Sequence, residues 1–318
     1  MKRALLLIPM VLASLSACQA LSELALPETN SFHTARHTGF VVLPSPTNAV
    51  QFRLYTNGAP HSAHLFNTFE LEAYGEVLLR SPGGEGLQRW LGMSPTNPVV
   101  HSLLVNGVGP QLASTNGLTM IEQAQGSGWR YLAFDASAAY RGRLTQYKRS
   151  VLFVEPDLFI LHDHLVASQP ASFQMILHPP AATRVDKTWG DLRLESSKAA
   201  FRIHAPAEKK KPRNWERVPT STDALFPGTV TMQLGPTNTL TELDLVTVFA
   251  VQRGGEKRDL AFRLLESPNA VGARIHREGL PTLVAFKTDP AVTQASLAGF
   301  PFTGPVGVDV FRPKQKVR

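Results

Sequence analysis

Hydrophobic and polar residues alternate along most of this chain with a period of two. Between Thr68 and Tyr74, for example, Phe69, Leu71 and Ala73 alternate with glutamates. Successive side chains of a β-strand point to opposite faces, so this pattern predicts strands with one buried and one solvated face. It predicts strands at residues 50–55, 68–74, 99–105, 129–134, 150–154, 158–166, 173–177, 243–251 and 282–286.

Turn-forming residues separate these predicted strands. Asn106-Gly107 follows one of them, and Glu155-Pro156-Asp157 predicts a tight hairpin between two others. The chain has 24 prolines and 23 glycines spread along its length, which leaves little room for long helices. Only residues 118–125 could form a short helix, and the Pro-rich, charged stretch 205–227 is expected to be a long loop.

The absence of helices between the predicted strands determines the predicted fold class. A parallel α/β sheet needs a helix at each crossover, whereas short strands joined by turns are typical of an antiparallel sandwich. We therefore predict one all-β domain, an antiparallel β-sandwich over residues 36–318. Its core should contain Phe69, Leu71, Leu103, Val105, Leu152, Phe159 and Leu161.

The first 17 residues are typical of a bacterial secretion signal. Lys2 and Arg3 precede an apolar run of about twelve residues, which is too short to cross a membrane as a helix. The signal ends in Leu-Ser-Ala before Cys18, which resembles the lipobox at which a lipid is attached to the Cys thiol. We expect cleavage before Cys18, lipidation of its thiol, and a tether over residues 18–35. An ordinary secretion signal with an incidental Cys is the alternative.

Composition supports an envelope location for the protein. Cys18 is the only cysteine, so a secreted form would have no internal disulfide and its single thiol needs another explanation. Gln19 follows the anchor, and the lipobox resemblance then implies sorting to the outer membrane. Removal of Lys2 and Arg3 with the signal lowers the net charge from +7 to +5. A basic envelope protein can favour acidic glycans or anionic lipid surfaces, and no nucleic-acid module is present in the sequence.

Four ordered segments within residues 39–179 resemble the C-terminal β-sandwich domain of the heparinase II/III-like polysaccharide lyases. A histidine-containing segment that leads into a Phe-first strand spans residues 61–75, and Leu-Leu-Arg-Ser-Pro-Gly follows at 78–83. A strand that opens on His101 ends in Asn-Gly. An Arg-Ser strand, a Pro-Asp turn and a strand that ends in Asp occupy residues 149–163. His178 stands where the family often closes the next strand.

The resemblance implies a heparinase-like sandwich and places His61 on the family's catalytic histidine. In the lyases, an (α/α) toroid precedes the sandwich and carries the Tyr and the Asn or His that act with that histidine. Only about twenty residues separate Cys18 from the first predicted strand. We therefore expect no toroid in this chain, and any partner groups would come from a separate toroid-domain or lyase chain.

The same resemblance implies that the zinc site of the family is lost. Ala63 and Ser81 stand at two of its ligand positions, and only His101 remains. A methyl group has no lone pair for zinc, and a structural zinc site needs several N, O or S ligands. We expect no metal and no other cofactor. If a site were rescued, His64 and His101 would be its first ligands.

A strand with two histidines and an aspartate, and several aromatic residues, are further candidates for function. Alternation places His162 and His164 on one face of a strand and Asp163 on the other, among apolar neighbours. A buried carboxylate is costly unless it is paired, so Asp163 is expected to be structural. Aromatic residues that could stack on sugars are Trp90, Trp129, Tyr140 and Trp215, although each such residue is more often part of a core.

Three functions fit the sequence. The first is a lipid-anchored sandwich that binds or helps to process acidic, uronate-containing polysaccharide without lyase activity of its own. The second is a lyase that uses His61 and obtains the missing groups from a partner chain. The third is a structural envelope lipoprotein. β-Elimination needs a carboxylate neutraliser, a base and an acid in one cleft, so a single inherited histidine favours the first function.

Overall fold

The computed structural model describes most of the chain after residue 33. The described residues are 34–35, 40–45, 49–56, 67–79, 101–110, 118–140, 142–186, 191–196, 198–205, 213–218, 228–256, 260–277 and 280–310. They are almost all strands, joined by turns and one short 3₁₀ helix, η2 (Ser137–Tyr140). They lie in a compact unit that spans residues 33–318.

An eight-stranded antiparallel sheet forms the middle of this unit. Its central strands are buried on both faces, which explains why the sequence there is apolar at consecutive positions and not only at alternate ones. The sheet order is β12 (Arg184–Asp186), β13 (Asp191–Glu195), β14 (Ala199–His204), β17 (Leu240–Arg253), β10 (Leu158–Ala171), β9 (Leu144–Val154), β8 (Trp129–Asp135) and β7 (Thr119–Gly126).

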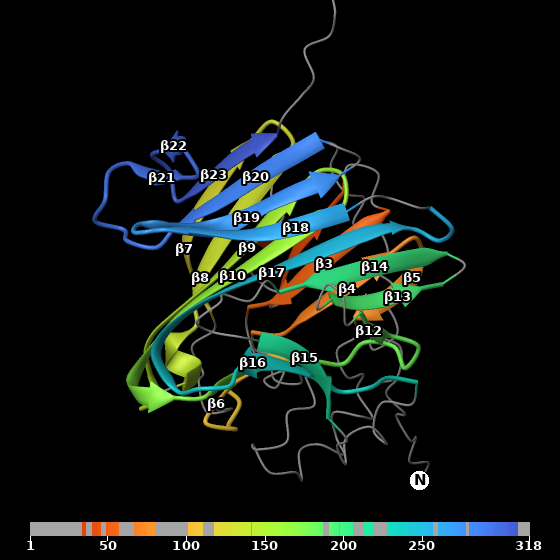
Figure 1. Cartoon of the computed structure of the whole chain (residues 1–318), viewed down its shortest axis with the longest axis horizontal. Helices are drawn as coiled ribbons and strands as arrows, with labels where there is room; N and C mark the ends of the chain where they lie inside the picture. Colours follow the sequence, from red (N-terminus) through yellow and green to blue (C-terminus); the bar gives the residue numbers. More distant parts are fainter. Residues whose placement is uncertain are drawn as a thin grey trace, which may run out of the picture. The chain divides into compact units, whose positions relative to one another are not determined.

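A four-stranded sheet covers one face of the eight-stranded sheet (Figure 1). Aliphatic side chains of the two sheets form a shared core, in which Ile160 and Val248 pack with Ile275 and Val284. The sheet order is β18 (Leu260–Ser267), β19 (Ala270–Arg277), β20 (Leu280–Lys287) and β23 (Val306–Val310). A smaller cluster joins this sheet to the hairpin β21 (Ala295–Leu297) and β22 (Phe300–Phe302).

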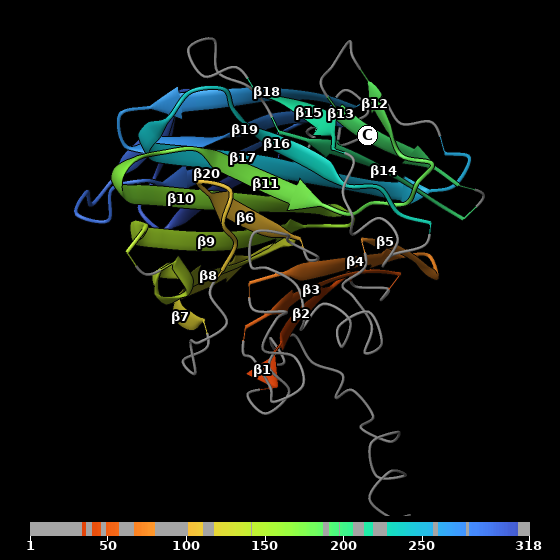
Figure 2. The same cartoon turned by 90° about the horizontal axis from the view of Figure 1, so that it is seen from below.

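Aromatic packing joins the opposite face to a further sheet. The ring of Phe52 stacks on Phe159 at 5.4 Å, and the ring of Phe69 meets Phe249 edge-on at 5.6 Å. This five-stranded sheet has the order β1 (Thr34–Ala35), β2 (Phe40–Pro44), β3 (Val50–Tyr55), β4 (Phe69–Ala73) and β5 (Glu76–Leu79). Figure 2 shows it and the β18–β23 sheet on opposite sides of the central sheet.

A second four-stranded sheet is formed by β15 (Arg213–Arg217), β16 (Met232–Pro236), β11 (Phe173–Leu177) and β6 (Ser102–Val105). Tyr140 of η2 donates a hydrogen bond to the carbonyl of Leu103 in β6 at 2.8 Å. After β6, Asn106 and Gly107 have φ angles of 54° and 74°. Asn and Gly adopt this left-handed backbone readily, which is why the Asn-Gly pair predicts a turn here.

The predicted β-sandwich is confirmed, with two corrections. All seven residues predicted for the core are buried, and the hairpin at residues 155–157 joins β9 and β10. The suggested helix at 118–125 is wrong, because these residues form the edge strand β7, whose exposed and half-buried positions alternate. The expected loop at 205–227 contains strand β15, which pairs with β16. No helix in the described part of the chain is long and apolar enough to span a membrane.

Candidate functional site

The predicted catalytic residue His61 lies outside the described residues, as do His64, Ala63, Ser81 and Cys18. The strand ends that flank residues 57–66 are described. The N–H of Tyr55 donates to the carbonyl of Thr68 at 2.9 Å, and the N–H of Asn67 donates to the carbonyl of Tyr55 at 3.0 Å. The connection that carries His61 therefore begins and ends at the paired strands β3 and β4. The role of His61 stays a prediction.

His101 is fully buried beside the start of β4. Its Nδ1 accepts the backbone N–H of His178 at 3.1 Å, and its ring stacks on Phe69 at 5.3 Å. The Nδ1 of His178 is 3.3 Å from the hydroxyl of Thr231. Within the described ranges, no group of three metal-ligating side chains includes His101. Because Nδ1 of His101 already accepts a hydrogen bond and Ala63 has no donor atom, the residues present do not fit the zinc site of the resembling family.

A buried ion pair ties the central sheet to the end of the His61 connection. Arg149 and Asp163 have no exposed surface, and their side chains form two hydrogen bonds of 2.7 and 3.0 Å. Nη1 of Arg149 also donates to the carbonyl of Asn67 at 2.6 Å. Burial alone would lower the pKa of Arg149, but the charge of Asp163 raises it above its usual value. The predicted structural role of Asp163 is confirmed.

The candidate aromatic residues do not form a sugar-stacking surface in the described part of the chain. Tyr140 and Trp215 are buried, and Trp129 packs against the core between the two main sheets. Trp90 lies outside the described residues.

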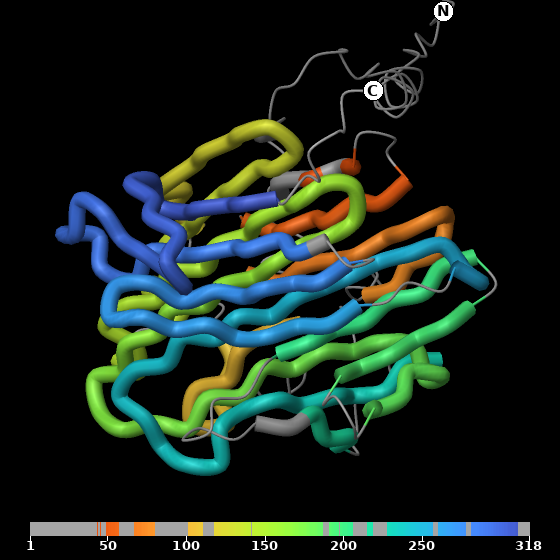
Figure 3. The backbone as a smooth tube through the Cα atoms, turned by 45° about the horizontal axis from the view of Figure 1, so that its top comes forward, coloured from red at the N-terminus to blue at the C-terminus, as the bar shows by residue number. Residues whose placement is uncertain are grey.

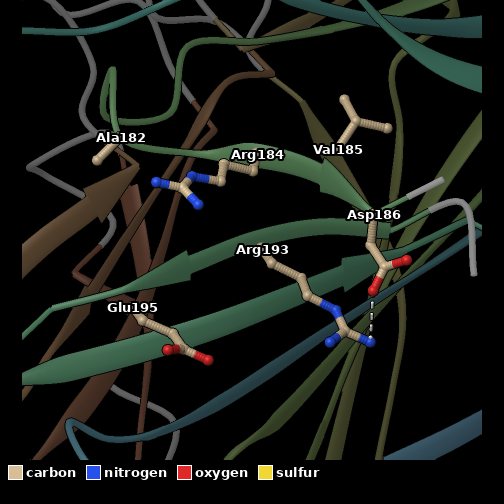
Figure 4. A pocket seen from close by; sticks show the side chains of 6 residues that line it. All are labelled: Ala182, Arg184, Val185, Asp186, Arg193 and Glu195. Carbon is tan, nitrogen blue, oxygen red and sulfur yellow. Dashed lines mark ion pairs between the residues drawn. The ribbon is translucent and has the colours of Figure 1, made fainter. Parts of the chain in front are cut away.

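A pocket of about 500 Å³ opens beside β12 and β13 at the edge of the central sheet (Figure 4). Its volume lies within the range that is common for small-molecule sites. Charged residues of both signs line it, together with two small apolar side chains. The lining residues are Ala182, Arg184, Val185, Asp186, Arg193 and Glu195.

Three arginines lie in one row across β12, β13 and β14. Arg184 pairs in register with Arg193, which pairs in register with Arg202. Like charges directly opposite each other in a sheet are unfavourable, so each needs an anion nearby. Arg193 pairs with Asp186 at 2.9 Å, and Arg202 pairs with Asp191. Arg184 is exposed and forms no ion pair with the residues that the structure describes.

One lining residue, Arg193, has a buried donor atom. Nε of Arg193 is buried and has no hydrogen-bond acceptor among the described residues. A buried N–H without a partner costs free energy. The two arginines and the two carboxylates that line the pocket balance in charge, but Arg193 is paired with Asp186, whereas Arg184 is exposed and has no carboxylate partner among the described residues.

Asp191 anchors the strands behind the pocket. The carboxylate is buried, and it is hydrogen-bonded by His204 and by Nε of Arg202 at 3.0 Å. Burial alone would raise the pKa of Asp191, but the bonds and charges of His204 and Arg202 lower it below its usual value. The ring of Phe262 in β18 stacks on His204 at 4.9 Å, so β18 runs beside β14 (Figure 3).

Sequence reasoning missed this pocket. A usable signal was present, because Arg184, Arg193 and Arg202 follow each other at intervals of nine residues. Equal intervals across two hairpins can bring like side chains into one row, but only the strand register shows that they do so.

No family model matches the sequence, and no curated protein matches it. Among solved structures, the chain is similar to the heparan sulfate lyase HepC of Pedobacter heparinus, with a TM-score of 0.62 and 15% identity over 80% of this chain. It is also similar to the heparinase III BT4657 gene product, with a TM-score of 0.61 and 13% identity over 83% of this chain. The chain covers 42% and 43% of these two proteins. They therefore share a fold with it over less than half of their length.

Proposed function

We propose that this protein is a lipid-anchored β-sandwich that binds acidic, uronate-containing polysaccharide in the cell envelope and has no lyase activity of its own. The observation that carries this proposal is the pocket with Arg184 and Arg193. The fold shared with a heparan sulfate lyase supports a polysaccharide ligand. A fold alone does not specify a function, so the residues of the pocket decide the class of ligand.

The lining of the pocket matches the chemistry of an acidic sugar. A guanidinium group binds carboxylate or sulfate oxygens through parallel N–H bonds, and Arg184 has no carboxylate partner among the described residues. Glu195 is exposed at the same pocket and can accept hydrogen bonds from sugar hydroxyls. A ligand with one anionic group and several hydroxyls would satisfy both kinds of residue.

Calorimetry with heparan sulfate and alginate oligosaccharides tests this assignment. Arg184→Ala should weaken binding by at least about tenfold, because one charge-assisted contact is worth about 1.5–3 kcal/mol. Arg263→Ala is the matched control, since Arg263 is an exposed arginine on β18 outside the pocket, and it should leave the affinity unchanged. Equal affinity of Arg184→Ala and the unmodified protein would show that the pocket is not the site.

The absence of independent lyase activity is proposed from the chemistry of β-elimination. The reaction needs several groups that neutralise the carboxylate, remove a proton and protonate the leaving oxygen. Of the family's catalytic set, this chain keeps only His61 at its motif position. One histidine without its partners cannot assemble that cleft.

A second proposed function is a lyase completed by a partner chain. One observation favours it: the chain covers only 42% of HepC. A toroid-domain protein added to this chain should then yield unsaturated uronate product, and His61→Ala should abolish that product. If the mixture releases no such product, this alternative is wrong.

Anchoring through Cys18 is part of the proposal and rests on the signal sequence. Intact-mass measurement of the native protein should find acylated Cys18 at the N-terminus. Cys18→Ala should lose stable membrane association, and Gln19 after the anchor supports placement in the outer membrane. A native protein without lipid at Cys18 would refute the anchor but leave the glycan-binding proposal intact.

A further inference from the structure

A second group of polar residues lies on the face of the central sheet that β18–β23 covers. His162 and His164 belong to β10, which lies beside β17 (Figure 1), and Glu242 and Asp244 belong to β17. The register places His164 directly opposite Asp244. Phe286 of β20 packs on the ring of His162 at 4.8 Å, so the group lies beside the shared core.

The side chains of this group converge on Asp244. Nε2 of His162 is 2.7 Å from Oδ1 of Asp244, and Nδ1 of His164 is 3.1 Å from the same oxygen. One ligand atom each from His164, Glu242 and Asp244 lie within 4.8 Å of one another. These three donors are close enough to share one metal ion after small side-chain movements, since metal–ligand bonds are about 2.0–2.2 Å long.

The charge around the group favours a cation. The cation nearest to His164 on the neighbouring strand is Lys148, and its ammonium forms an ion pair with Glu122 at 2.6 Å. The carboxylate of Glu122 also accepts a hydrogen bond from Tyr131. Because Lys148 and Glu122 offset each other, the two carboxylates Asp244 and Glu242 leave a net charge of about −2 when the histidines are neutral.

His162 holds the central carboxylate in place. The ring is 1% exposed, and its Nδ1 is buried without a hydrogen-bond partner among the described residues. Asp244 is therefore the acceptor that orients the ring, with Nε2 as the donor. Ligating carboxylates are typically fixed by such a hydrogen bond from outside the coordination sphere.

We infer that His164, Asp244 and Glu242 bind a divalent transition-metal ion, with His162 as a positioning residue for Asp244. One imidazole and two carboxylates suit ions such as Mn²⁺, and the exposure of Glu242 leaves open positions for water. This site is separate from the zinc position implied by the family resemblance, which involves residues 63, 81 and 101. It also goes beyond the proposed glycan function, because the Arg184 pocket does not include these residues.

Electron paramagnetic resonance titration of the purified protein with Mn²⁺ tests the site. We expect one bound ion per chain, and binding weaker by at least about tenfold in Glu242→Gln and in Asp244→Asn. Glu216→Gln removes an exposed carboxylate from β15 and is the matched control, with unchanged binding expected. His64→Ala should also bind as the unmodified protein does, because His64 belongs to the other candidate position.

Nuclear magnetic resonance gives a second readout. Substoichiometric Mn²⁺ should broaden the ring signals of His164, while the exposed His276 on β19 stays sharp. Glu242 is exposed, so Glu242→Gln should fold even if Asp244→Asn does not, and circular dichroism checks this. Absence of binding below millimolar Mn²⁺, or equal binding by Glu242→Gln, would overturn the inference.

Discussion

At the scale of single residues, the side chain of Arg149 links two strands of the central sheet to the five-stranded sheet. It forms an ion pair between β9 and β10 with Asp163, and it donates a hydrogen bond to the carbonyl of Asn67, just before β4. Its guanidinium also lies over the rings of Phe69 and Tyr147. The ion pair lies within the central sheet, and the hydrogen bond to Asn67 links that sheet to the five-stranded sheet. A buried ion pair contributes little net stability over apolar packing.

Loss of one partner should nevertheless be costly. Asp163→Asn leaves the Arg149 guanidinium buried without its counter-ion, so the free energy of unfolding should fall by about 3–5 kcal/mol. Urea denaturation measures this change. Glu70→Gln, which breaks the partly exposed pair with Arg53, is the control and should cost about 1 kcal/mol or less. Similar costs for the two variants would mean that Arg149 finds another partner or water.

The lowered pKa of Asp191 predicts a pH dependence of stability. The ordinary pKa of this group is 3.8, and the fold lowers it, so ionised Asp191 stabilises the protein above that value. The contribution is lost as pH falls from about 4 through the lowered pKa. Asp191→Asn should therefore be less stable than the unmodified protein at pH 7, and the difference should shrink below about pH 4. Thermal unfolding at several pH values measures it, and a difference that is constant with pH would contradict this assignment.

At the scale of strands, local alternation predicted nine segments, and each of them overlaps one of the 23 strands that the structure describes; the other strands were not predicted. Strands β3 and β11 have the predicted bounds, because their patterns are clean over their whole length. Strands β9 and β17 begin before the predicted bounds, where exposed polar residues hide the alternation. The edge strand β7 was mistaken for a possible helix, because an edge strand with a partly exposed face has a weak apolar signal.

The pairing between strands that are distant in the chain could not be predicted from the sequence. Strand β17 lies between β10 and β14, and nothing local in either segment specifies those partners. The same limit hid the arginine row and the convergence of His162 and His164 on Asp244. Alternation did place these two histidines on one face and Asp163 on the other, and their hydrogen bonds confirm this.

One glycine tests the close contact between strands. A methyl group at Gly272 of β19 would overlap the backbone carbonyl of Val284 in β20, which cannot move without breaking the sheet. Gly272→Ala should cost about 1–3 kcal/mol or more of unfolding free energy. Gly304→Ala is the control, because the nearest atom to its new methyl group would be 3.5 Å away. If both variants denature at the same urea concentration, β19 and β20 leave room for a methyl group at position 272, which would contradict the close contact between these two strands.

At the scale of the whole molecule, the fold of this sandwich matches part of the heparan sulfate lyase HepC and of the heparinase III BT4657 gene product. The matching part is less than half of each of those proteins. The resemblance in the sequence predicted this fold, and the structure confirms it. The resemblance could not indicate the pocket at β12 and β13, because the matching segments end at about residue 179, before these strands begin. A ligand site there depends on residues that the shared motifs do not include.

We propose that this sandwich binds acidic polysaccharide and does not cleave it. Incubation of the purified protein with heparan sulfate, alginate and chondroitin tests it most directly, with binding and unsaturated uronate absorbance followed in the same samples. We predict binding that weakens as salt is added and in Arg184→Ala, with no rise in absorbance. Product formation by the protein alone that His61→Ala abolishes, or no binding to any of these polysaccharides, would contradict the claim.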